Sequence, residues 1–161
     1  MALFEKHLEV KPSQIPNAGN GLFTKVFIPK GENIVEYKGK ITTWKEVSKQ
    51  DGNNLYIMYV TEKHVIDAGN AKKSFARYAN DAKGLTKIEG LKNNGIYVHD
   101  KKKRVFIEAK RDIQAGEEIL VGYGGDYWKT IRKNMKIDEE KKKKAEKKAE
   151  KKASKKQAQM P

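Results

Sequence analysis

The chain has 161 residues, of which 35% are charged and 37% hydrophobic, and it carries a formal net charge of +14. This length accommodates one domain and a tail, the absence of cysteine excludes disulfides and thiolate-bound zinc, and three scattered histidines argue against a histidine metal site. No apolar run is long enough to span a membrane and the start of the chain lacks a secretory signal, so we expect a soluble intracellular protein, cytoplasmic or associated with a nucleus or nucleoid.

The first predicted elements surround a pair of glycines. Residues 3–10 alternate apolar and polar side chains, which predicts a strand, and residues 12–20 are rich in Pro, Asn and Gly, which predicts a loop. In the segment Ala18-Gly19-Asn20-Gly21, glycine permits a positive φ and lets a ligand come close to the main chain. A plain hairpin turn is the commoner explanation of such a pattern, and at this point both interpretations stay open.

Two segments far apart in the chain share one pattern. Residues 27–32 lead into an apolar run at 34–37, and residues 112–117 lead into another at 119–123. Each segment has a glycine where a tight turn needs one, followed by residues typical of a buried strand. We therefore predict two turns of the same kind, each entering a core strand.

A short helix and a hairpin are predicted next. Thr42 or Thr43 is a suitable N-cap for a helix that ends near Lys49, before a polar segment. Residues 55–60 and 63–67 then have the composition of two paired strands. We expect these two strands to form a hairpin.

The stretch 65–81 has the most unusual composition of the chain. A short apolar run is followed by a glycine-containing turn, and a tight helical turn is predicted around Arg77. Because Phe75 and Tyr78 favour burial, they would carry Arg77 and Asn80 toward the interior, where buried polar groups need partners. A bound ligand is one candidate partner.

The end of the predicted domain is again rich in strands. Residues 82–94 are polar and predict a loop, whereas residues 95–99 and 104–109 predict two further strands. We expect about eight to ten short strands and little helix before residue 127. The predicted fold class is therefore mostly β.

Residues 132–161 differ from the rest of the chain. They contain thirteen Lys or Arg and five Asp or Glu, a net charge of +8, which predicts a domain at 1–131 and a basic tail at 132–161. Residues 129–156 include strong helix formers and acid-first pairs such as Glu139 with Lys143, but they offer little apolar surface to a core. We expect a solvated, partly frayed helix, which is either a solubilising extension or a segment that binds nucleic acid or an acidic protein.

Four pieces of the sequence, in this order, resemble the SET-domain protein lysine methyltransferases over roughly residues 4–128. They are Gly19-Asn20-Gly21, Glu36-Tyr37-Lys38-Gly39, Ile66-Asp67-Ala68-Gly69-Asn70 through Ala76-Arg77-Tyr78-Ala79-Asn80-Asp81, and Gly116-Glu117-Glu118-Ile119 through Gly122-Tyr123-Gly124. The resemblance implies the SET fold, in which small twisted sheets surround a pseudoknot made when the C-terminal part threads under a loop at Asn80. It also implies S-adenosylmethionine in a surface pocket, a target lysine entering from the opposite face through a narrow channel, and no metal.

The resemblance implies a set of cofactor-binding residues. The main chain around Ala18 and Asn20 would hold the methionine end of the cofactor, and Asn80 would accept a hydrogen bond from its amino group. The whole set is Ala18, Gly19, Asn20, Gly21, Arg77, Tyr78, Asn80, Asp81 and Trp128. For Trp128, an aromatic cap on the core is an equally good interpretation.

Tyr123 matches the catalytic tyrosine of the family, and the resemblance puts Tyr56, Tyr97 and Val121 along the substrate-lysine channel. Methyl transfer from a sulfonium to a neutral amine depends on positioning, and a phenol orients both groups without adding a charge. Lysine is almost fully protonated at neutral pH, and desolvation beside the cationic sulfonium favours its neutral form. Many members carry Phe or Tyr where this chain has Val121, so Tyr97 would fill that space and favour monomethylation.

The main departure from the family is Asp81, which stands where a histidine usually follows the asparagine. If the position acts through its backbone, Asp81 is tolerated, and if the imidazole is needed, cofactor affinity falls. Two functions are therefore open: an S-adenosylmethionine-dependent N-methyltransferase acting on a lysine of a protein, or a catalytically weak SET-like module that binds nucleic acid or an acidic assembly through its tail. The substrate protein and the number of methyl groups are not identified by the sequence.

Overall fold

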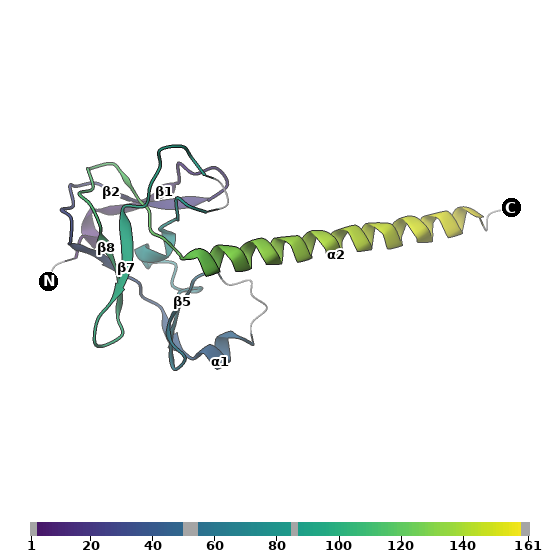
Figure 1. Ribbon diagram of the computed structural model, residues 1–161, viewed down its shortest axis with the longest axis horizontal. Helices are drawn as coiled ribbons and strands as arrows, with labels where there is room; N and C mark the ends of the chain where they lie inside the picture. Colours follow the sequence, from purple (N-terminus) through teal and green to yellow (C-terminus); the bar gives the residue numbers. More distant parts are fainter. Residues whose placement is uncertain (1–2, 50–54, 85–86, 159–161) are drawn as a thin grey trace. The chain divides into compact units, whose positions relative to one another are not determined.

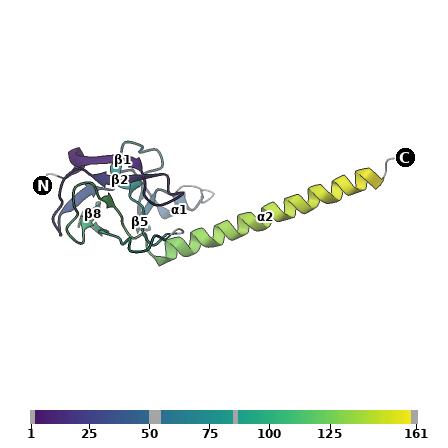
Figure 2. The same ribbon diagram turned by 90° about the horizontal axis from the view of Figure 1, so that it is seen from above.

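The computed structural model describes residues 3–49, 55–84 and 87–158, with side chains in the long C-terminal helix described at 136–155. The chain divides into two compact units, residues 1–122 and residues 123–161, and each is described by itself. The strands lie in the first unit, and the helix α2 (Gly125–Ala158) belongs to the second (Figures 1 and 2). None of the helices in the described ranges is long and apolar enough to cross a membrane. The predicted division at residues 131 and 132 stays a prediction.

Nine strands within the described residues form three small antiparallel sheets, so the predicted mostly-β fold class is confirmed. The first sheet has the order β1 (Leu8–Pro12), β2 (Asn20–Thr24), β9 (Glu118–Ile119). The second sheet has the order β3 (Asn33–Glu36), β8 (Val105–Ala109), β7 (Gly95–His99). The third sheet has the order β4 (Lys40–Thr42), β6 (His64–Asp67), β5 (Ile57–Thr61). Three short helical segments accompany them: η1 (Glu5–His7), α1 (Trp44–Val47) and η2 (Phe75–Tyr78).

The two predicted glycine turns are confirmed, and the fold joins them to each other. Gly31 and Gly116 both have a φ of 90°, a left-handed conformation that glycine adopts without strain. Ile28 and Ile113, which precede the turns, are fully buried and exchange two backbone hydrogen bonds of 2.8 Å. The repeated pattern in the sequence thus corresponds to two turns held together across one antiparallel bridge.

The predicted strand at residues 3–10 is wrong in its first half. The backbone N–H of Phe4 donates to the Ile34 carbonyl at 3.0 Å, and the N–H of His7 donates back to the Phe4 carbonyl at 2.8 Å. The first bond attaches the segment to Ile34, and the second closes a helical turn, η1. The regular pairing with β2 therefore begins only at Leu8 and continues to Pro12. Alternation of side chains did not reveal that a tertiary hydrogen bond holds the start of this segment.

The predicted strand at residues 119–123 is also shorter than expected, because the segment changes partners along its length. Glu118 and Ile119 pair with β2. Beyond them, the N–H of Val121 donates to the Asn80 carbonyl at 2.8 Å, while the Leu120 carbonyl accepts from Asn94 and Gly95 at 2.9 and 2.8 Å. Residues 120 and 121 therefore run between the segment of Asn80 and the start of β7, as the implied pseudoknot requires.

The remaining predicted elements are present with shifted ends: α1 ends at Val47 instead of near Lys49, and β5 covers Ile57–Thr61 instead of residues 55–60. Thr43 caps α1, since its Oγ1 accepts from the Glu46 N–H at 3.3 Å, and β5 and β6 form the expected hairpin. The strands β7 and β8 and the helical turn η2 also lie where the sequence predicts them. The helix α2 is longer than predicted, and its described side chains at 136–155 are all exposed, in agreement with a solvated helix.

Candidate active site

The loop before β2 is closed by its own backbone. The Ser13 N–H donates to the Gly19 carbonyl at 2.9 Å, and the Ala18 N–H donates to the Ile15 carbonyl at 3.2 Å. Closing so short a loop requires left-handed residues, and both Asn17 and Gly19 have positive φ, 65° and 71°. A side chain at Gly19 would meet no atom within 4 Å, so open space lies beside this glycine.

Asn80 joins this loop to the segment that follows η2. Its Nδ2 donates to the Asn20 carbonyl at 3.0 Å and to the Glu118 Oε2 at 3.4 Å. Sixty residues separate Asn20 from Asn80 in the sequence, yet the fold makes them neighbours. The two segments that the family resemblance assigns to the methionine end of the cofactor therefore lie side by side, whereas their roles stay predictions.

Glu118 is the residue that connects these two segments, and it was not among the predicted site residues. It is 3% exposed, and its carboxylate accepts from the Ser13 Oγ at 2.7 Å and from the Gln14 N–H at 3.1 Å, in addition to Asn80. A Cβ on Gly21 would collide with this carboxylate. Gly21 is thus needed for Glu118, while Gly19 provides the positive φ and the open space.

Arg77 lies between two predicted site tyrosines. Its guanidinium carbon is 3.8 Å from the centre of the Tyr56 ring and 5.1 Å from that of Tyr78, distances typical of cation–π contacts. Its Nη1 also donates to the carbonyls of Ala68 and Gly69 at 2.7 and 3.0 Å, which secures the turn after β6. The predicted cofactor residues Arg77 and Tyr78 therefore share one cluster with Tyr56, which the resemblance assigns to the lysine channel.

Asp81 has a structural function within the loop that follows it. It is 5% exposed, and its Oδ1 accepts from the Lys83 N–H at 2.8 Å and from the Asn93 Nδ2 at 2.9 Å. The Oδ1 of Asn93 in turn accepts from the Ala82 N–H at 2.8 Å. Asp81 and Asn93 together tie the two ends of the 82–93 loop, which gives a physical reason for a carboxylate at this position.

Tyr97 and Val121 lie near the same strand. Val121 is fully buried and forms a parallel bridge to Gly95, the first residue of β7, while Tyr97 is half-buried two residues further along β7. The Tyr97 ring meets Tyr37 edge to face, with 6.2 Å between ring centres and an angle of 83°. Residues two apart in a strand share a face, so Gly95 and Tyr97 face the same side of β7. That Tyr97 fills the space which a larger residue at position 121 would occupy stays a prediction.

Tyr123 and Trp128 belong to the second unit. Tyr123 is half-buried and precedes α2, and its place relative to Asn80 stays a prediction. The side chain of Trp128 lies outside the described residues, so its assignment to the cofactor is untested.

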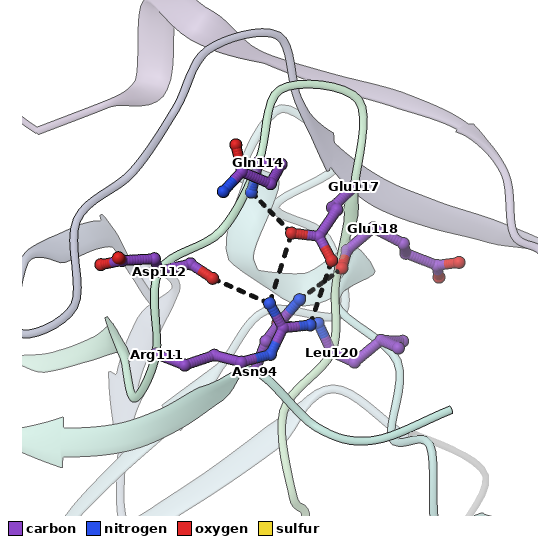
Figure 3. Close-up of polar contacts among 7 residues, drawn as sticks. All are labelled: Asn94, Arg111, Asp112, Gln114, Glu117, Glu118 and Leu120. Carbon is purple, nitrogen blue, oxygen red and sulfur yellow. Dashed lines mark hydrogen bonds and ion pairs between the residues drawn. The ribbon is translucent and has the colours of Figure 1, made fainter. Parts of the chain in front are cut away.

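A pocket of about 580 Å³ in the first unit is lined by none of the predicted site residues. Its lining residues are Gln14, Phe23, Gly90, Leu91, Lys92, Asn94, Arg111, Gly116, Glu117, Glu118 and Leu120. Figure 3 shows its polar groups bound to one another: Arg111 donates to Glu117 at 3.0 and 3.3 Å, and Asn94 donates to the Glu118 carbonyl at 2.8 Å. The hydrogen bond from Arg111 lowers the pKa of Glu117, and we assign no ligand to this pocket.

Comparison with known proteins identifies the family. The model of the SET domain matches residues 19–124, about two thirds of the chain, which includes every predicted site residue except Ala18 and Trp128. The chain belongs to the SET-domain family. The SET resemblance and the SET fold are thereby confirmed, and no group of three His, Asp or Glu able to hold a metal occurs in the part of the chain that the structure describes.

Three relatives illustrate the range of the SET proteins that the chain is similar to. Histone-lysine N-methyltransferase set-17 of Caenorhabditis elegans is 29% identical over 73% of this chain and 41% of its own, and the variant-silencing SET domain-containing protein of Plasmodium falciparum is 31% identical over 77% and 5%. N-lysine methyltransferase KMT5A-A of Danio rerio is 29% identical over 68% of this chain and 33% of its own. The chain spans less than half the length of each of these relatives.

Two buried asparagines in this SET domain were missed by the sequence interpretation. Asn93 and Asn94 are 7% and 1% exposed, and the Asn94 Oδ1 accepts from the Leu120 N–H at 2.8 Å. They end the polar segment that the sequence predicts to be a loop, where asparagine is ordinary. The available signal was their position immediately before a strand that begins with glycine. The Asn94 side chain bonds to Glu118 and Leu120, and the Asn93 side chain bonds to Asp81 and Ala82.

Proposed function

We propose that this SET domain is an S-adenosylmethionine-dependent protein-lysine N-methyltransferase. The proposal rests on one observation above the others. The two segments expected to bind the cofactor are far apart in the sequence and are joined in the fold by the hydrogen bond from Asn80 to the Asn20 carbonyl. Membership of the SET family, several of whose members are named as lysine methyltransferases, adds independent support.

The residues present fit a small ligand with an ammonium group and a carboxylate. The Nδ2 of Asn80 donates to Asn20 and Glu118, and its Oδ1 would be the acceptor for the ammonium group. Gly19 adds open space, and the buried Nε of Arg77 is a donor without a partner in the described ranges. S-adenosylmethionine carries both an ammonium and a carboxylate, and when bound it supplies a methyl group on a sulfonium.

Positioning is the main contribution that we propose for this chain. Tyr123 would orient the neutral ε-amine toward the methyl group that the bound cofactor would supply. Arg77 would hold Tyr56 at the substrate channel by the cation–π contact, and Tyr97 would restrict the space beside Val121 so that one methyl group is transferred. The product is a methylammonium, so no general base is needed in the transfer step.

Asp81 bears on whether the enzyme is active. Its carboxylate is used by Lys83 and Asn93 inside the loop, so the replacement of a histidine is explained by local structure. This supports the alternative in which the position serves the cofactor through its backbone. We therefore expect the substitution to be compatible with cofactor binding.

The test combines binding with transfer. Calorimetric titration with S-adenosylmethionine should show saturable binding, and labelled cofactor should transfer its label to a lysine in at least one of a panel of basic proteins. Tyr123→Phe should keep the binding and reduce transfer by about 100-fold or more, because the amine and methyl group lose alignment. Absence of binding together with absence of label on every protein would contradict the proposal.

A second candidate function rests on the basic tail with its net charge of +8. In this case the SET domain would be a weak enzyme or none, and the tail would bind nucleic acid or an acidic assembly. Salt-dependent binding in the absence of cofactor binding would favour it. The functions are compatible, and methyl increments on tail lysines that disappear in Tyr123→Phe would reveal that the chain methylates itself.

A further inference from the structure

The helix α2 carries its lysines unevenly around its axis. At about 100° per residue, seven lysines fall within an arc of about 140°, which we call the lysine face. They are Lys141, Lys144, Lys147, Lys148, Lys151, Lys152 and Lys155. Between residues 141 and 155 this arc contains no other residue type, and the other eight residues, two Lys, two Glu, three Ala and one Ser, have no net charge. All side chains from 136 to 155 are exposed.

Lysines on the lysine face and lysines outside it also differ in their acidic neighbours. Lys142 and Lys143, outside the lysine face, each have three acidic residues at a spacing of three or four residues. Lys148 and Lys151, on the lysine face, have none at these spacings and are instead flanked there mainly by other lysines. Like charges at a spacing of four residues destabilise an isolated helix. The lysines of the lysine face therefore repel one another, and an anionic partner would reduce this repulsion.

We propose that the lysine face of α2 binds the phosphate backbone of double-stranded DNA without sequence preference. Seven positive charges over a rise of about 21 Å correspond to one charge per roughly 3 Å, close to the one phosphate per roughly 3.4 Å along each strand of a duplex. The major groove also admits an α-helix, which would let a helix with one charged face lie along the phosphates. Lysine acts here as a point charge, which suits contacts to the backbone and not to base edges.

The same helix lacks the features that other anionic partners require. A membrane-surface helix needs an apolar face opposite its basic residues. Here the residues outside the lysine face are three alanines, two glutamates, two lysines and one serine. Binding of single strands relies on aromatic side chains for stacking, and residues 129–161 contain none. The inference rests on the second candidate function and specifies its partner. It uses α2 alone and does not depend on methyl transfer, so it and the methyltransferase proposal can fail separately.

The test uses the full chain and two variants with the same change in charge. Lys148→Gln/Lys151→Gln alters the lysine face, and Lys142→Gln/Lys143→Gln is the matched control outside it; glutamine is a good helix former, and circular dichroism would verify equal helicity. Fluorescence anisotropy would follow binding to two unrelated DNA duplexes of about 30 base pairs between about 50 and 200 mM salt.

We expect both duplexes to bind equally, with an affinity that falls steeply as salt rises. The lysine-face variant should weaken binding by about tenfold or more and lower the slope of log affinity against log salt by about 1.8, since each lost phosphate contact lowers it by about 0.9. The control should change affinity less than about threefold. No binding at about 50 mM salt, equal loss in both variants, or tighter binding to polyglutamate or to phosphatidylserine vesicles than to DNA would overturn the proposal.

Discussion

Glutamate serves opposite purposes in the two units of this molecule. Glu118 is 3% exposed and accepts hydrogen bonds from Ser13, Gln14 and Asn80, so it binds two loops of the SET domain together. Glu139 and Glu146 in α2 are exposed, and each has lysines of its own helix at a spacing of three or four residues. The same residue type therefore supports a site when it is buried among hydrogen-bond donors, and contributes to a pattern of surface charge when it remains in water.

The largest effect on stability is expected for substitution of the buried residue Glu118. Glu118→Ala should lower the free energy of unfolding by about 3 kcal/mol, because donors in two loops lose their acceptor. Gly21→Ala should also destabilise the wild-type protein, since the added Cβ meets the Glu118 carboxylate. In the Glu118→Ala background, the same substitution should lower the free energy of unfolding by less than half as much. Chemical denaturation of the single and double variants measures this coupling, and full additivity would contradict the contact.

A smaller loss is expected in the 82–93 loop. Asp81→His should cost about 2 kcal/mol, because an imidazole cannot replace the one oxygen that accepts from both Lys83 and Asn93 in a buried position. Asp81→Asn keeps an oxygen at that place and should cost about 1 kcal/mol or less. Thermal unfolding in parallel with cofactor titration separates stability from affinity; a stable Asp81→His variant with tighter cofactor binding would show that the imidazole matters.

Glu117 provides an intermediate case with a pH dependence. The hydrogen bond from Arg111 lowers its pKa below the ordinary 4.5, so its contribution to stability is present above that value and is lost as the pH falls through the folded-state pKa. Because the pair is partly exposed, we expect less than about 1 kcal/mol. The difference in stability between the wild type and Glu117→Gln should therefore shrink below about pH 4.5; a constant difference down to pH 2 would contradict the shift.

The smallest effect is expected in the tail. Deletion of residues 141–161 should change the free energy of unfolding of the remaining chain by less than about 0.5 kcal/mol, since the described side chains from 141 to 155 are all exposed. Chemical denaturation followed by tryptophan fluorescence measures it. A loss comparable with that of Glu118→Ala would remove the distinction between the two units.

Local patterns made much of the fold predictable. Glycine turns at Gly31 and Gly116, the cap at Thr43 and the helix α2 all depend on neighbours in sequence, so residue type was sufficient. The start of β1 was not predictable, because a bond from Phe4 to the distant Ile34 determines it. Asn93 was missed for the same reason, since its partner Asp81 lies twelve residues away.

Residue order alone established the family, the mostly-β class and a basic helical tail, because motifs, alternation and charge are properties of short segments. The folded chain decided which of those residues meet: Asn80 with Asn20, Glu118 with Ser13, and Arg77 with Tyr56. These pairs join parts of the chain between 21 and 105 positions apart. Such contacts form only when burial of the core brings the loops together, because buried polar groups then have to find partners within the protein.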